Sequence, residues 1–67
     1  MYYVVTHIRI NRKSWSETRQ TAHDPVEINK AFKAQIAECI AQGYIARIET
    51  GYEDAGQKQV YGKFELF

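Results

Sequence analysis

The first thirteen residues of the chain alternate between apolar and polar side chains. The even positions from Tyr2 to Ile10 are mostly apolar or β-branched, whereas the odd positions include His7, Arg9 and Lys13. A period of two is typical of a strand that buries one face. We therefore predict a strand that starts at Tyr2 and buries its even-numbered side chains, followed by a polar turn at residues 11–14.

Residues 16–22, Ser-Glu-Thr-Arg-Gln-Thr-Ala, are polar and contain no Gly or Pro. We interpret them as a short second strand at the edge of a sheet, where charged side chains discourage unwanted pairing. A loop is the alternative interpretation.

The strongest local signal is a helix that starts after Asp24. Asp24 can cap the free N–H groups, Pro25 suits the first helical position, and Glu27 completes a capping box. Gly43 can adopt the left-handed conformation that ends a helix. The apolar positions between them recur at spacings of three and four, which predicts one buried stripe: Ile28, Phe32, Ile36, Cys39 and Ile40.

The last 24 residues predict a hairpin with strands at 44–53 and 57–67. A three-residue loop, Asp54-Ala55-Gly56, would join them, since loops that end in Gly combine a type I turn with a bulge. If Glu53 faces Gln57, the register continues with Thr50 opposite Val60, Ile48 opposite Gly62, Ala46 opposite Phe64 and Tyr44 opposite Leu66. Even positions then meet even positions, whereas a slip of one residue would scatter the apolar side chains over both faces.

These elements predict a single α+β domain spanning residues 1–67, with the order ββαββ. One helix would pack on the even-numbered face of one antiparallel sheet. The expected core contains twelve residues: Val4, Ile8, Ile10, Ile28, Phe32, Ile36, Ile40, Tyr44, Ile48, Val60, Phe64 and Leu66.

A single helix leaves the other face of the sheet uncovered. That face would carry the odd-numbered side chains of the strands: Tyr3, Val5, His7, Arg9, Lys13, Ile45, Arg47, Glu49, Tyr61, Lys63, Glu65 and Phe67. A mixed face of this kind can pair with a copy of itself, bury its apolar part in another protein, or stack nucleic-acid bases beside cations. A simply solvated face, with the cations paired to neighbouring glutamates, is the remaining alternative.

Charge is nearly balanced over the whole chain but not along it. Nine Lys and Arg against eight Asp and Glu give a net charge of +1, which by itself does not imply a nucleic-acid partner. Residues 1–20 hold four cations, Arg9, Arg12, Lys13 and Arg19, against one glutamate. Beside them Trp15 is either a lid over the edge of the core or an anchor for a partner, since Trp is enriched at binding hot spots.

The chemistry of catalysis and metal binding is sparse in this sequence. His7, His23 and Cys39 fall on different elements, and Cys39 belongs to the apolar helix stripe. Because no spacing matches a metal or phosphate-binding motif, we predict no enzyme, no metal and no cofactor. No apolar run approaches a membrane span and the N-terminus lacks a signal peptide, so we expect an intracellular protein that does not bind membranes.

Two short strings and the order of elements resemble a family of small phage-encoded anti-CRISPR proteins, inhibitors of type I systems. The strings are Thr21-Ala22-His23-Asp24 before the helix and Arg47-Ile48-Glu49-Thr50 in the third strand. The resemblance implies a non-enzymatic inhibitor that docks on the RNA-guided surveillance complex in the cytoplasm of a bacterial host and denies it target DNA. The near-neutral charge departs from the acidic inhibitors that mimic DNA.

We therefore predict a small binding protein, encoded by a phage or another mobile element, that occludes a protein surface of a host defence complex. The predicted partner-binding residues are Arg9, Arg12, Lys13, Trp15, Arg19, Arg47, Tyr61 and Lys63. Two alternatives stay open. One is direct nucleic-acid binding by the basic first hairpin and the uncovered face, and the other is a structural homodimer formed through that face.

Overall fold

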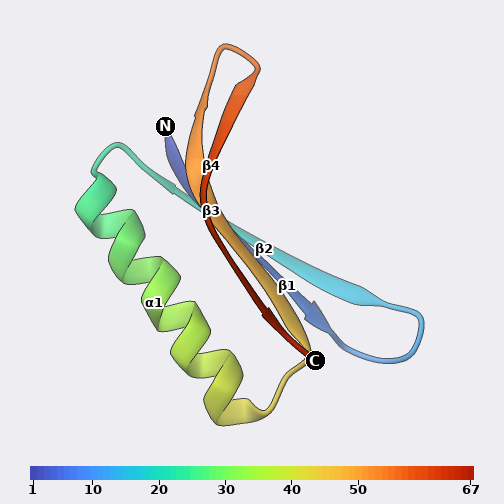
Figure 1. Ribbon diagram of the computed structural model, residues 1–67. Coiled ribbons are helices and arrows are strands. Elements are labelled where there is room, and N and C mark those ends of the chain that lie inside the picture. The colour runs from blue at the N-terminus through green and yellow to red at the C-terminus, as the bar shows by residue number, and fades with distance from the viewer.

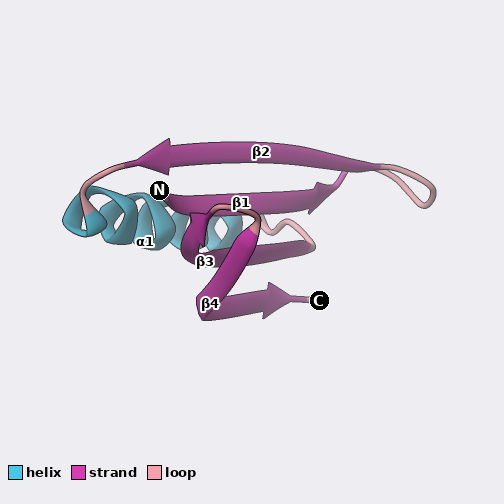
Figure 2. Cartoon of the chain, turned by 90° about the horizontal axis from the view of Figure 1, so that it is seen from above, coloured by secondary structure: helices cyan, strands magenta, loops and turns pink.

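Four antiparallel strands and one helix make up the computed structural model, which describes residues 1–67. The elements are β1 (Tyr2–Arg9), β2 (Trp15–Ala22), α1 (Pro25–Gln42), β3 (Ala46–Asp54) and β4 (Gln57–Leu66). The strands form one sheet in the order β2-β1-β3-β4, and α1 lies against one of its faces (Figures 1 and 2). The predicted ββαββ architecture is confirmed, and β2 is a strand, not a loop.

β1 is a central strand, paired with β2 on one side and β3 on the other. Its even-numbered side chains face α1, and Val4 and Thr6 are buried there. The strand ends at Arg9, whose Nη2 donates a 3.0 Å hydrogen bond to the Arg12 carbonyl across the following turn. Ile10 lies beyond the strand and is 65% exposed, so its predicted place in the core was wrong.

Both predicted ends of the helix are present. The Asp24 carboxylate accepts a 2.9 Å hydrogen bond from the Val26 N–H, and Pro25 is the first helical residue. At the other end Gly43 adopts a φ of 72°, the left-handed conformation that a side chain would disfavour. α1 lacks the combination of length and apolar character that a membrane-spanning helix needs.

The core lies between α1 and the sheet. Its fully buried apolar members are Val4, Ile28, Cys39, Ala46 and Ile48, with Tyr2, Ile8, Ala22, Ala31, Phe32, Ile36, Phe64 and Leu66 packed around them. Of the predicted core residues in α1 and the segment after it, Ile40 and Tyr44 lie outside the core. At about 100° per residue, Cys39 projects about 20° from the direction of Ile28, but Ile40 projects about 120° from it. Ile40 is therefore 56% exposed, and Tyr44 is exposed because β3 begins only at Ala46.

The β3–β4 hairpin has a different register from the predicted one. A two-residue turn, Ala55-Gly56, joins the strands with positive φ at both positions, so Asp54 pairs with Gln57. Farther along, Ile48 pairs with Phe64 and Ala46 with Leu66, two positions away from the prediction. In this part of the hairpin, far from the turn, even positions still pair with even positions. The two-residue turn alone would pair even with odd positions, and one extra residue in β4 restores the even-to-even pairing.

That extra residue is Tyr61. Thr50 pairs with Gly62 and Gly51 with Val60, which leaves Tyr61 as a β-bulge. Bulges bend a strand, and the tip of the hairpin accordingly turns away from α1 (Figure 1), with β4 sharply bent (Figure 2). Beyond the bulge Val60 pairs with an odd-numbered residue and is exposed, so its predicted core position was wrong.

The bent half of the hairpin covers part of the face that we predicted to be open. A Cβ on Gly51 would lie 2.0 Å from the Gln59 carbonyl oxygen and 2.9 Å from the Tyr3 hydroxyl, so the backbone approaches closely here. Tyr3 is only 1% exposed and Val5 is also buried, although both project from the face opposite α1. The prediction that these two side chains are exposed was wrong, because the pattern of side chains did not reveal the bend.

Candidate functional site

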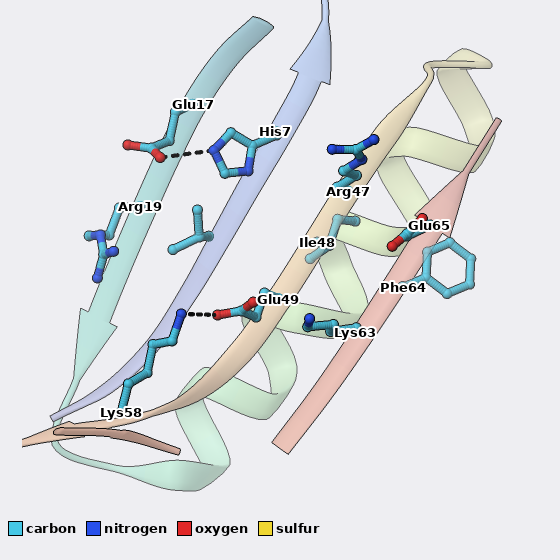
Figure 3. A pocket seen from close by; sticks show the side chains of 11 residues that line it. His7, Glu17, Arg19, Arg47, Ile48, Glu49, Lys58, Lys63, Phe64 and Glu65 are labelled. Atoms are coloured by element: carbon cyan, nitrogen blue, oxygen red, sulfur yellow. Dashed lines mark hydrogen bonds and ion pairs between the residues drawn. The ribbon is translucent and has the colours of Figure 1, made fainter. Parts of the chain in front are cut away.

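A groove of about 450 Å³ runs along the face of the sheet opposite α1. All four strands contribute to it, and Figure 3 shows charged side chains of the strands, among them Glu17, Arg47 and Glu49, on this face of the sheet. Its lining residues, called the groove residues below, are Val5, His7, Glu17, Arg19, Arg47, Ile48, Glu49, Lys58, Lys63, Phe64 and Glu65. Eight of these eleven residues are polar or charged, so the groove suits a polar ligand surface better than an apolar one.

Acidic side chains lie beside basic or imidazole side chains across the groove, because neighbouring strands place them side by side. Glu17 of β2 lies 2.9 Å from the ring of His7, its register partner on β1. Lys58 reaches back from the bent part of β4 to Glu49 at 3.2 Å (Figure 3). At the rim, Arg19 contacts Glu53 of the hairpin at 3.2 Å. The side chains are partly exposed, so these pairs add little stability but set a pattern of both signs.

One partly buried hydrogen bond anchors this arrangement. The Tyr3 hydroxyl donates to the Glu49 carboxylate at 2.7 Å, and the Arg19 guanidinium lies 5.5 Å from the centre of the Tyr3 ring. Burial, reinforced by the hydrogen bond to Glu49, raises the pKa of Tyr3 to about 12. The same hydrogen bond, with help from Lys58, lowers the pKa of Glu49. Near neutral pH Tyr3 is a neutral donor and Glu49 a fixed negative charge, which makes them structural groups of the groove.

Trp15 and Arg47 form an aromatic–cation pair on the same face. The Arg47 guanidinium lies 5.2 Å from the centre of the Trp15 ring, and Trp15 remains 40% exposed. Trp15 is not among the side chains that pack around the core. Of the two roles the sequence left open, the structure therefore rejects the lid over the core edge, and an accessible aromatic beside the groove remains.

The structure separates the eight predicted binding residues into three groups. Arg19, Arg47 and Lys63 are groove residues, and Trp15 contacts one of them. Arg9, Arg12 and Lys13 belong to the exposed end of β1 and the turn after it. Arg9 donates through Nε and Nη2 to two carbonyls of that turn, which holds its guanidinium there.

The eighth residue, Tyr61, is not on the groove face. Its ring lies 6.4 Å from that of Tyr2, a side chain of the helix-covered face, and its hydroxyl donates to Gln59 at 3.2 Å. The predicted placement beside Lys63 was wrong because Tyr61 is the bulged residue, and the bulge interrupts the alternation of faces.

Lys58 is a groove residue for which the sequence predicted no role. Its contact with Glu49 exists only because the hairpin bends. The sequence did hold a signal for that bend, since Gly51 and Gly62 interrupt both strands, and glycine inside a strand marks a bulge or a close backbone approach.

The groups capable of catalysis lie apart. His7 is in the groove, whereas Cys39 is a buried residue of α1. Burial raises the pKa of the Cys39 thiol, with a further contribution from Glu38. No three His, Cys, Asp or Glu side chains gather in a geometry that could hold a metal ion. Comparison of the chain with protein-family models, with curated proteins and with solved structures finds no match.

Proposed function

We propose that this chain is a non-enzymatic binding protein that occludes the surface of a partner protein with its groove face and the basic turn between β1 and β2. The observation that carries the proposal is the Trp15–Arg47 pair, an accessible aromatic and a cation beside a groove of about 450 Å³. Trp and Arg are the residues most enriched at the energetic centres of protein interfaces.

The charge pattern favours a protein partner over nucleic acid. Glu17, Glu49 and Glu65 line the groove among its cations, and Glu53 stands at its rim. A phosphate backbone would meet repulsion from these carboxylates, whereas a protein surface can present both signs in complementary positions. Tyr61, which we predicted to stack bases beside Arg47 and Lys63, lies on the other face, and Trp15 is the exposed aromatic that contacts a groove cation.

The resemblance to type I anti-CRISPR proteins makes an RNA-guided surveillance complex of a bacterial host the first partner to test. In this proposal the chain inhibits that defence complex by steric occlusion. Arg12 and Lys13 project from the exposed turn and would extend the contact beyond the groove. A shift of association rate with ionic strength is expected from such peripheral cations.

The test is affinity capture on purified, immobilised surveillance complexes and from nuclease-treated lysate, with wild-type protein and two variants. We expect Trp15→Ala and Arg47→Ala each to weaken binding by about 30-fold, the effect of losing about 2 kcal/mol at a hot spot. Lys33→Ala, which removes an exposed cation from α1, is the matched control and should bind like wild type.

Two results would contradict the proposal. One is capture that is unchanged in both groove variants while circular dichroism shows them folded. The other is recovery of nucleic acid alone, with an affinity that falls steeply with salt, which would move direct nucleic-acid binding into first place.

A further inference from the structure

β2 is an open edge of the sheet. It pairs with β1 over eight consecutive residues without a bulge, contains no Pro, and has seven of its eight residues exposed. Figure 2 shows β2 as the outermost strand, with no other segment along its outer side. Every second N–H and C=O of such a strand points outward without a protein partner, which is a template for another strand.

The other edge of the sheet is unlike this one. β4 is interrupted by the Tyr61 bulge and bent, and both features discourage strand addition. β2 has only its charges as protection, Glu17 and Arg19, which have opposite signs and lie two residues apart on one face. Charges of one sign would repel a second copy of the strand, but this pair does not.

The sequence of β2 is complementary to itself in one antiparallel register. With Thr18 opposite Thr18 of a second copy, Glu17 of each chain faces Arg19 of the other. Opposite charges in directly opposed positions stabilise a strand pair, and like charges destabilise it. A shift of two residues in either direction places Arg19 opposite Arg19 or Glu17 opposite Glu17. The same register sets Ser16 opposite Gln20, a pair of exposed polar side chains.

We infer that β2 is a dimerisation edge, and that its occupant is β2 of a second copy of this chain, antiparallel, with Thr18 on the two-fold axis. The two sheets then form one continuous sheet of eight strands, with both helices on one face and both grooves side by side on the other. This interface differs from a homodimer through the groove face, because it leaves the groove open. It does not depend on the proposed function.

Native mass spectrometry over a series of protein concentrations tests the charge pairing with Arg19→Glu and Glu17→Arg. Wild type should show a concentration-dependent dimer. Each single variant places like charges at both symmetric positions and should dimerise at least about tenfold more weakly. Mixing the two variants restores both opposite-charge pairs, so a heterodimer of intermediate mass should form about as tightly as the wild-type dimer.

Lys33→Glu on the exposed side of α1 makes the same charge change as Arg19→Glu away from β2 and should dimerise like wild type. A monomer at every concentration would overturn the inference. So would a dimer that the single variants leave intact, or a mixture that forms no heterodimer.

A second variant tests the register without changing any charge. Residues on a two-fold axis between antiparallel strands have Cα atoms within the span of a disulfide. Thr18→Cys should therefore form a cross-linked dimer under mild oxidation, while Cys39 stays inert in the core. Ser16→Cys is the matched control, because Ser16 faces Gln20 and its introduced thiols would lie apart. Equal cross-linking of the two variants, or none in Thr18→Cys, would contradict this register.

Discussion

The two faces of this sheet are both partly buried, but by different means. On the face under α1, Val4 and Ile48 are buried by the apolar stripe of a helix. On the opposite face Tyr3 is as fully buried as Val4, yet what lies near its hydroxyl is the backbone of the bent hairpin and the Glu49 carboxylate. The first face excludes water with a separate element, and the second does so with a fold of the sheet upon itself.

This difference decides how each face can be used. Contacts under α1 are apolar and close-packed, so they stabilise the fold and offer nothing to a partner. Contacts on the groove face combine one partly buried hydrogen bond with partly exposed ion pairs, and they leave charged side chains accessible. The groove therefore depends on the bend, and the bend depends on a backbone position without a side chain, Gly51.

The largest effect is expected from Gly51→Ala, which places a methyl group 2.0 Å from the Gln59 carbonyl oxygen. Backbone cannot yield as a flexible side chain does, so we expect a loss of about 3 kcal/mol in the free energy of unfolding, measured by urea denaturation. Gly62→Ala is the matched control in the paired strand, where the nearest atom is the Thr50 methyl at 3.4 Å. Equal stability of the two variants would show that the close approach at Gly51 does not constrain the fold.

The face under α1 could be predicted from the sequence in most of its parts. Asp24, Gly43 and the alternation of β1 define the helix and the buried side of the sheet through local rules, which act within a few residues. The errors there have separate causes. Ile10 and Tyr44 lie beyond the ends of strands, where they have no partner to pack against. Ile40 projects away from the buried side of α1, and Val60 lies beyond the bulge of β4.

The groove face could be predicted only in part, because side chains alternate between the two faces of a strand and the pattern therefore distinguishes only odd from even positions. The predicted three-residue loop and the observed two-residue turn with a bulge inside β4 both bring Ile48 opposite an even-numbered residue of β4. The apolar pattern excludes a slip of one residue but cannot distinguish registers that differ by two. Arg47 and Lys63 were therefore placed correctly, whereas Tyr61, Lys58 and the buried Tyr3 were not.

A smaller effect is expected from Tyr3→Phe, which keeps the buried ring but removes the hydroxyl that donates to Glu49. A hydrogen bond to a charged group contributes about 2 kcal/mol, and we expect a loss of that size in the free energy of unfolding. Tyr61→Phe removes a hydroxyl from an exposed side chain bonded to Gln59 at 3.2 Å and should cost less than about 0.5 kcal/mol. If both variants lost the same stability, the Tyr3–Glu49 bond would not be what holds the groove face.

The smallest effect is the dependence of stability on acid pH. The hydrogen bond from Tyr3, aided by Lys58, holds the pKa of Glu49 below its ordinary value of 4.5, so the unfolded chain binds this proton more readily than the folded one. The contribution of Glu49 is therefore fully present above pH 4.5 and is lost as the pH falls through the lower pKa of the folded state.

Glu49→Gln carries no titrating group at this position. Between pH 7 and 5 the urea unfolding midpoints of wild type and Glu49→Gln should change in parallel, and below pH 4.5 the wild-type midpoint should fall more steeply. Both proteins contain the same other carboxylates, so parallel curves down to pH 3 would mean that the folded sheet does not favour the ionised form of Glu49.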